Sequence, residues 1–263
     1  MARETLTVAA LQWGASLDPA ANRAALADVP DAASAAELVV LPEAFARDFG
    51  PVTEPLAPYA EEQGGAFDDA LSGVADGACT VVAGMFERSD DEVRPFNTLL
   101  VRGGATAAYR KIHLYDSFGY RESDRLSAGD WAPVVVDVAG WKVGVLTCYD
   151  LRFPELARDL VAAGAEVLVV PAAWLPGRTP EEHDRKVDHW RTLARARAIE
   201  NVSYVVAVGQ PAPRYTGRSL VVDPYGAVVA EAGAEAAELL ATLERGVLDE
   251  ARSTNPSLTN RVH

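Results

Sequence analysis

Residues 141–170, WKVGVLTCYDLRFPELARDLVAAGAEVLVV, contain two kinds of apolar pattern in succession. The flanking runs, WKVGVLT and EVLVV at 166–170, are short and apolar, as is typical of β-strands. Between them, apolar residues at helical spacing fall on one face of a helix; these are Phe153, Leu156, Ala157, Leu160 and Val161. Pro154 lies in the first turn of this helix, where proline is tolerated. The segment therefore predicts a strand–helix–strand unit.

Similar runs on both sides of this segment predict further strands. Including those above, the strand candidates are 5–12, 38–41, 79–86, 97–101, 133–138, 142–147, 166–170, 203–208, 219–222 and 227–230. An Ala-rich stretch before residue 38 and a mixed-charge stretch at 181–201 predict helices between the strands. VVVDV at 134–138 and EVLVV are nearly continuous apolar runs, which indicates strands covered on both faces. The pattern predicts an α/β architecture and leaves a doubly wound sheet open.

Length and composition predict one domain over residues 1–263. The chain has 263 residues, 49% of them hydrophobic, which is enough for one sizeable core. No repeat, low-complexity tract or Gly/Ser linker divides it. Residues 48–66 and 116–132 are polar or rich in Pro and Gly and are expected to be long loops, which are places where sites are often built.

The charge balance bears on partners and location. The formal net charge is −14, which disfavours binding to nucleic acid and to anionic membranes, so neither is expected as a partner. No apolar run reaches the roughly 20 residues that span a bilayer, and the start shows no secretion signal, so we expect a cytoplasmic protein. Two cysteines are too few for a disulfide framework.

Of the two cysteines, Cys148 has the more reactive setting. It closes the strand-like WKVGVLT just before the predicted helix, where backbone N–H groups and the helix dipole are expected to lower the thiol pKa. Cys79, in ACTVVAGMF, is interpreted as a small core residue. A cysteine nucleophile needs a base within hydrogen-bond reach. His113 could supply one, because it lies in the extended segment YRKIHLYD.

Carboxylates are the competing candidates for the base. Glu43, in LPEAF, follows the strand-like ELVVL, and Lys111, in AAYRKIH, also follows a strand candidate. The carboxyl ends of strands are where open α/β sheets build their sites. A lysine there would stabilise a thiolate or a developing oxyanion. His183 and His189 could instead belong to a metal-dependent hydrolase, although their spacing does not place two ligands on one helix face.

The segments LPEAF, YRKIHLYD and LTCYDLRFPEL, in this order, resemble the nitrilase or carbon–nitrogen hydrolase superfamily. The resemblance extends from ALQW near the start through PAAW, RARAIEN and SLVVDPYG. It implies a four-layer αββα sandwich and a Glu–Lys–Cys triad without a metal or an organic cofactor. In that triad Glu43 is the general base, Lys111 the oxyanion-stabilising lysine and Cys148 the nucleophile. Glu122 matches a second glutamate that many members place beside the triad.

KIHLYD and CYDLRFPEL are most similar to the omega-amidase-like branch, which hydrolyses small amides of carboxylic acids. The resemblance then implies a thioester intermediate, with the backbone N–H of Tyr149 as a second oxyanion donor. The 116–122 stretch is shorter than usual in that branch and the stretch between Trp174 and Trp190 is longer, so the pocket is expected to be specialised. A carboxylate on the substrate would be met by residues near the mouth of the pocket, for which the candidates are Arg121, Arg152, Trp174 and Arg178.

Other readings of the function remain open at this point. Members of the superfamily that hydrolyse carbamoyl compounds or nitriles share the triad, and a catalytically silent member could act as a binding or scaffold protein. The resemblance also implies a homodimer or a larger homo-oligomer that pairs through the helical layer. The expected partners are therefore a small amide and further copies of the chain.

Overall fold

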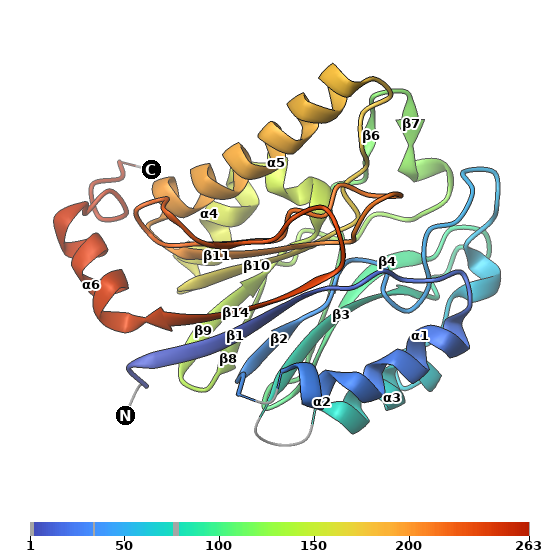
Figure 1. Cartoon of the computed structure of the whole chain (residues 1–263), viewed down its shortest axis with the longest axis horizontal. Helices are drawn as coiled ribbons and strands as arrows, with labels where there is room; N and C mark the ends of the chain where they lie inside the picture. Colours follow the sequence, from blue (N-terminus) through green and yellow to red (C-terminus); the bar gives the residue numbers. More distant parts are fainter. Residues whose placement is uncertain (1–2, 34, 76–78, 263) are drawn as a thin grey trace.

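The computed structural model describes residues 3–33, 35–75 and 79–262. Within these residues, two six-stranded β-sheets face each other, and helices cover the outer face of each sheet (Figure 1). The α/β class and the four-layer αββα arrangement are both confirmed. The doubly wound alternative, which has a single central sheet, is excluded by the second sheet.

The first sheet has the strand order β14-β1-β2-β3-β4-β5. Strands β1, β2 and β3 are parallel, and β4, β5 and β14 join them through antiparallel pairs. The strand bounds are β1 (Thr5–Gln12), β2 (Leu38–Val40), β3 (Thr80–Glu87), β4 (Phe96–Gly103), β5 (Ala107–Arg110) and β14 (Ala237–Glu244).

The second sheet has the order β13-β12-β11-β10-β9-β8. Here β9, β10 and β11 are parallel, and antiparallel pairs add the outer strands. The bounds are β8 (Val134–Val138), β9 (Trp141–Val145), β10 (Val167–Ala172), β11 (Tyr204–Gly209), β12 (Leu220–Val222) and β13 (Val228–Glu231). A separate short hairpin pairs β6 (Asp116–Ser117) with β7 (Tyr120–Arg121).

Helices α1 (Pro19–Ala25), α2 (Val29–Ala32) and α3 (Ala66–Val74) lie against the first sheet (Figure 1). Helices α4 (Pro154–Ala162) and α5 (Pro180–Asn201) lie against the second. Helix α6 (Arg245–Thr254) follows β14 at one end of the molecule. Short 3-10 turns complete the set: η1 (Leu26–Asp28), η2 (Ala57–Tyr59), η3 (Glu122–Asp124) and η4 (Cys148–Arg152).

Side-chain alternation explains why the strands are apolar on both faces. In β1, Val8 points into the core between the sheets, whereas Ala9 and Leu11 point toward the helices outside the first sheet. In β2, Val40 and Val39 divide in the same way. Successive residues of a strand point to opposite faces, so a strand inside a four-layer sandwich has no face that can be polar.

The two predicted helices at 153–161 and 181–201 are confirmed by α4 and α5. The long loops are confirmed in part, because 116–132 contains β6, β7 and η3. In the described part of the chain, no helix is both long and apolar enough to cross a membrane.

Candidate active site

The candidate active site lies where strands of both sheets end. Glu43 lies three residues beyond the end of β2, and Cys148 lies three residues beyond the end of β9. Lys111 directly follows β5, and Ala173 directly follows β10. Glu43 and Lys111 thus come from the first sheet, while Cys148 and Ala173 come from the second. The facing of the two sheets brings these loop starts into one pocket, which Glu43, Lys111, Glu122 and Cys148 all line.

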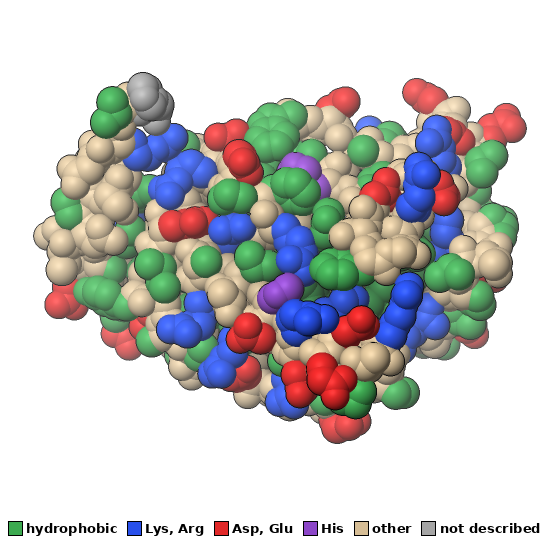
Figure 2. All heavy atoms as spheres, turned by 90° about the horizontal axis from the view of Figure 1, so that it is seen from above, with side chains coloured by type: hydrophobic (Ala, Val, Ile, Leu, Met, Phe, Trp, Pro, Cys, Tyr) green, Lys and Arg blue, Asp and Glu red, His purple; other side chains and the backbone are tan. Residues whose placement is uncertain are grey.

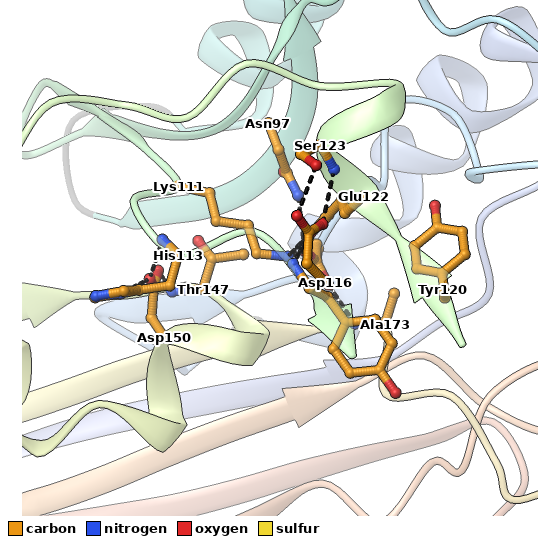
Figure 3. Close-up of polar contacts among 12 residues, drawn as sticks. Asn97, Lys111, His113, Asp116, Tyr120, Glu122, Ser123, Thr147, Asp150 and Ala173 are labelled. Carbon is orange, nitrogen blue, oxygen red and sulfur yellow. Dashed lines mark hydrogen bonds and ion pairs between the residues drawn. The ribbon is translucent and has the colours of Figure 1, made fainter. Parts of the chain in front are cut away.

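Lys111 lies between two carboxylates. Its Nζ is 2.9 Å from Glu43 Oε1 and 2.8 Å from Glu122 Oε2, and it also bonds Glu122 Oε1 at 2.9 Å (Figure 3). All three side chains are at most 3% exposed. Isolated buried charges are costly, and the pairing compensates each of them.

Neutral donors fix the orientation of Glu43. Asn97 Nδ2 donates to Oε1 at 2.7 Å, and the backbone N–H of Ala173 donates to Oε2 at 2.7 Å. The loop that carries Glu43 packs tightly on β3, because a Cβ atom at Gly84 would lie 2.3 Å from the backbone nitrogen of Ala44. Both sheets therefore hold the carboxylate in place.

Cys148 opens the 3-10 turn η4 with a left-handed backbone, φ +46°. This conformation is uncommon for a residue with a side chain and costs about 1–2 kcal/mol. The surrounding bonds maintain it: Thr147 N donates to Asp150 Oδ2 at 2.9 Å, and Asp150 N donates to Thr147 O at 2.9 Å. The turn carries Cys148 into the pocket, where only 8% of the residue is exposed.

Asp150 also ties the cysteine turn to the lysine segment. Its Oδ2 accepts from the hydroxyl of Tyr109 at 2.6 Å, and its Oδ1 accepts from His113 N at 2.9 Å (Figure 3). Because Tyr109 and His113 lie on either side of Lys111 in the chain, the fully buried carboxylate of Asp150 holds together the segments that carry Lys111 and Cys148. The ring of His113 turns to Asp150 as well, with Nδ1 2.8 Å from Oδ1, and stacks on Phe153. This ring is committed to Asp150, so a Cys148–His113 dyad is not supported.

Charges and burial in the pocket favour a neutral thiol. Burial and, next, the Glu43 carboxylate raise the pKa of Cys148 well above its usual value, although the Lys111 ammonium opposes them. The expectation of a lowered thiol pKa is therefore wrong, because burial and the carboxylates outweigh the opposing charge of Lys111. A hydrogen bond between Glu43 and the thiol acts in the same direction. A neutral thiol needs a base before it can act as a nucleophile, and Glu43 is the carboxylate with the largest effect on the thiol pKa.

The pKa values of Lys111 and Glu122 respond to burial in opposite ways. Burial alone would lower the pKa of Lys111, but the carboxylates of Glu122 and Glu43 outweigh it and raise that pKa well above the usual value. Burial raises the pKa of Glu122, and the Lys111 charge opposes this rise. Both Glu122 oxygens accept hydrogen bonds from Lys111, and Oε2 also accepts from Tyr115 N at 2.6 Å. This bonding suits an ionised carboxylate, which has no proton to donate.

Some of the predicted substrate contacts lie in this pocket and others do not. Tyr149, Arg152 and Trp174 line it together with Glu43, Lys111 and Cys148. Arg121 lies outside it, with 70% of its side chain exposed and a contact to Asp124 at 3.6 Å. Arg178 also lies outside the lining; its Nη2 donates to Phe118 O at 3.2 Å and so holds the β6–β7 hairpin.

Other residues of the pocket were not singled out from the sequence. Lys186 of α5 lines the same pocket, and so do Tyr115, Tyr120 and Arg125. Asp150 and Asn97 act behind the pocket by orienting the residues that line it. Asp150 lies inside the quoted motif LTCYDLRFPEL, which was the available signal for it. Lys186 had no such signal, because it is one of many charged residues in its helix.

Three other residues considered from the sequence, Cys79, His183 and His189, do not line this pocket. Cys79 is half-buried and packs against the core between the first sheet and its helices, in keeping with a small core residue. His183 and His189 both lie in α5. Within residues 3–33, 35–75 and 79–262, no three His, Cys, Asp or Glu side chains form a group that could hold a metal ion.

Comparisons with known proteins agree with the fold described above. The carbon–nitrogen hydrolase family model matches residues 7–253. A deaminated glutathione amidase from Synechocystis sp. is 36% identical over 244 residues, covering 86% of each chain. The structure of Nit3 from Saccharomyces cerevisiae, a member of branch 10 of the nitrilase superfamily, has a TM-score of 0.85 and 28% identity, covering 100% of this chain and 98% of Nit3.

A third similar protein is the amidase from Nesterenkonia sp. AN1, with 26% identity and a TM-score of 0.78, covering 99% of this chain and 95% of that one. A glutamate-to-glutamine mutant of that amidase carries the acetamide moiety of fluoroacetamide, covalently added at the active-site cysteine. The chain described here belongs to the carbon–nitrogen hydrolase family, within the nitrilase superfamily. Its relatives include deaminated glutathione amidases, and the protein is a carbon–nitrogen hydrolase.

Proposed function

We propose that the protein hydrolyses the C–N bond of a small amide bearing a carboxylate, and releases ammonia and an acid through a thioester on Cys148. The buried cluster of Glu43, Lys111 and Glu122 beside a cysteine supports this proposal most directly, with Lys111 Nζ 2.9 Å from Glu43 Oε1. It supplies a nucleophile, a base and a fixed positive charge in one pocket, as amide hydrolysis requires.

In the first half of the reaction, Glu43 takes the thiol proton while Sγ of Cys148 attacks the amide carbonyl carbon. A C–S bond forms, and the carbonyl electron pair moves to the oxygen. The Lys111 ammonium and the backbone N–H of Tyr149 stabilise that oxyanion; loss of one such donor typically costs about 10²–10³ in rate. The C–N bond then breaks, and Glu43 returns the proton to the departing nitrogen. Ammonia and a thioester result.

In the second half, water attacks the thioester. Glu43 takes a proton from this water, and the second oxyanion occupies the same donors. When the intermediate collapses, the C–S bond breaks and Glu43 returns its proton to the sulfur. The acid leaves and the neutral thiol is restored, which agrees with the raised pKa of Cys148 that results from burial and from Glu43.

The test is ammonia release across matched panels of small amides, carbamoyl compounds and nitriles. We expect the amides to be hydrolysed fastest, those with a remote carboxylate above all. Hydroxylamine added during turnover should trap the thioester as a hydroxamate. Cys148→Ala should form neither ammonia nor hydroxamate.

Faster turnover of a carbamoyl compound or a nitrile would instead assign the protein to another branch of the superfamily. If Cys148 is labelled by a thiol-reactive amide mimic but no panel compound is turned over, the protein is a catalytically silent binding member.

The assembly is a separate proposal: we propose a homodimer or larger homo-oligomer that pairs through the helical layer. The α5 face carries both signs of charge (Figure 2), which suits contact between identical copies.

A further inference from the structure

In the described part of the chain, two cations of the pocket wall make neither an ion pair nor a hydrogen bond shorter than 3.2 Å. Arg152 lies in η4, four residues after Cys148, and Lys186 lies in the second turn of α5. Both are half-buried, and both line the pocket that contains Cys148. In the described part of the chain, neither has a carboxylate within 4.0 Å, the distance that defines an ion pair. Their charges are therefore not neutralised by the protein.

The other pocket cations have partners. Lys111 is paired with two carboxylates, and Arg214 Nε lies 2.9 Å from Asp48 Oδ1. Arg125 uses its guanidinium to hold loops, since it donates to Phe49 O at 2.6 Å and to Glu54 O at 3.0 Å. The charged groups of these three residues are thus already bound by acceptors of the protein.

The local bonds of the two cations leave donors available. Lys186 Nζ contacts only weak neutral acceptors among the described residues, at 3.2 Å from Tyr115 Oη and 3.3 Å from Pro176 O. The Nε atom of Arg152 is buried, with no hydrogen-bond partner in the described structure. A buried donor without an acceptor costs about 1–3 kcal/mol, a cost that an anionic ligand would remove.

Aromatic rings hold the two cations near each other. The Phe118 ring centroid lies 5.1 Å from Lys186 Nζ and 5.7 Å from the Arg152 guanidinium carbon. Arg152 also lies 5.0 Å from the Trp174 ring, and Lys186 lies 5.7 Å from the Tyr115 ring. Rings stabilise a cation without neutralising its charge. Burial and then the charge of Arg152 lower the pKa of Lys186, as expected for neighbouring like charges.

We propose that Lys186 and Arg152 together form an anion subsite that binds the remote carboxylate of the amide substrate, with Lys186 as a specificity-determining residue. The inference rests on the proposed function, which identifies the reacting amide near Cys148. It assigns the opposite end of the substrate to a pair of cations set in an aromatic wall. A carboxylate there supplies the anionic partner that both lack among the described residues, and the bidentate donors of Arg152 fix its plane.

The first experiment compares a dicarboxylic acid monoamide with its neutral methyl ester on the wild type and three variants of the enzyme. Lys186→Met keeps the length of the side chain and removes its charge, and Lys186→Arg restores a cation. The matched control is Arg121→Met, which removes an exposed cation outside the pocket. We expect Lys186→Met to lower kcat/KM for the monoamide at least tenfold, mainly through KM, and to change that for the ester less than threefold. Lys186→Arg should recover most of the loss.

A second measurement uses pH. A lysine with a lowered pKa loses its charge at lower pH than an ordinary lysine, so KM for the monoamide should rise as pH rises through that pKa. The arginine of Lys186→Arg stays charged and should flatten this rise. The charged and titratable groups acting on Lys186 are Arg152, Glu182, Arg178 and Cys148, with the Tyr115 hydroxyl in contact.

An unchanged ratio of monoamide to ester kcat/KM in Lys186→Met would overturn the inference while leaving amide hydrolysis intact. If the wild type hydrolyses neither compound, the proposed function is refuted. The anion subsite is then tested by measuring ligand binding. Calorimetry with glutarate as the probe should then show binding to the wild type that Lys186→Met weakens at least tenfold. Equal binding of glutarate to both forms, or no binding to either, would refute the anion subsite.

Discussion

Replacing Glu43 by glutamine tests the proposed mechanism most directly, because glutamine keeps the shape of the side chain and removes its charge. In the structure, Oε1 accepts from Lys111 and Asn97, and Oε2 accepts from the backbone N–H of Ala173. An amide has one acceptor oxygen and one NH₂ group. Whichever way the introduced amide turns, its NH₂ group therefore faces another donor.

The expected cost in stability follows from that mismatch. A buried donor left without an acceptor costs about 1–3 kcal/mol. For a chain of this size, each kcal/mol corresponds to roughly 2–4 °C in Tm. We therefore expect Glu43→Gln to fold with a Tm that is lower by about 2–12 °C, as measured by calorimetry. Lys111 keeps Glu122 as its partner, so no buried charge is left wholly uncompensated.

The expected effect on the reaction is larger. General acid–base catalysis contributes about 10²–10⁴ in rate, and Glu43 is proposed to act at every proton transfer. Ammonia release by Glu43→Gln should therefore fall by at least about 10², measured below the Tm of the variant. Simple alkylation should behave differently. Since the Glu43 carboxylate raises the pKa of Cys148, its removal lowers that pKa, and the alkylation profile should shift to lower pH.

Glu122→Gln is the matched control. It also removes a buried carboxylate that bonds Lys111 and raises the thiol pKa, but the hydrogen bond to the thiol comes from Glu43. Both variants should shift alkylation in the same direction, and Glu43→Gln should lose more turnover. In the Nesterenkonia amidase, the active-site cysteine is covalently modified in a glutamate-to-glutamine mutant. This observation is in line with a separation of alkylation from turnover. Turnover of Glu43→Gln within tenfold of the wild type, or equal to that of Glu122→Gln, would refute the assignment of the base.

Three further predictions concern the nucleophile, its support and the assembly. Cys148→Ala should abolish ammonia release with its fold intact by circular dichroism, whereas Cys79→Ala should keep it; turnover by Cys148→Ala would exclude the thioester. Asp150→Asn turns an amide NH₂ group toward the donors of Tyr109, Thr147 or His113. The free energy of unfolding should therefore fall by about 1–3 kcal/mol, and kcat should fall more than KM rises. An unchanged denaturation midpoint and an unchanged kcat would contradict this. Sedimentation at micromolar concentration should give at least twice the 28.0 kDa monomer mass, and a monomer would remove the oligomer proposal.

The sequence predicts most strands and the two helices on the second sheet because their residues are buried in regular patterns. It places Lys111 at a strand end without giving bounds for that strand, β5, and it misses β14 and the short strands β6 and β7, whose patterns are weaker. β5 is only four residues long, and β14 alternates half-exposed and exposed positions along most of its length, with Leu240 55% exposed. Burial that arises only from tertiary contacts leaves little local signal in such segments.

The site shows a similar division. Glu43, Lys111 and Cys148 are identified because each follows a strand inside a recognisable motif, and the structure brings them to one pocket. Arg121 and Arg178 have the same residue type as Arg152 and lie near motif residues in the sequence, yet neither lines the pocket. A loop sequence does not fix which way a side chain faces, because the direction depends on the fold around it. Lys186 shows the reverse case, since helix α5 brings it to the pocket from a distant stretch of chain.

The net charge of the buried cluster favours transfer of the thiol proton to a glutamate rather than to water, as the proposed mechanism requires. With a neutral thiol, Lys111, Glu43 and Glu122 sum to one negative charge. If Cys148 released its proton to water, the net charge of the pocket would be two negative charges. A pair of like charges about 4 Å apart costs about 4 kcal/mol at an effective dielectric constant of about 20. Transfer of the proton to Glu43 keeps the sum at one. Glu122 then stays ionised, holds Lys111 as an ammonium, and leaves that ammonium facing the new oxyanion at the moment when Glu43 no longer neutralises it.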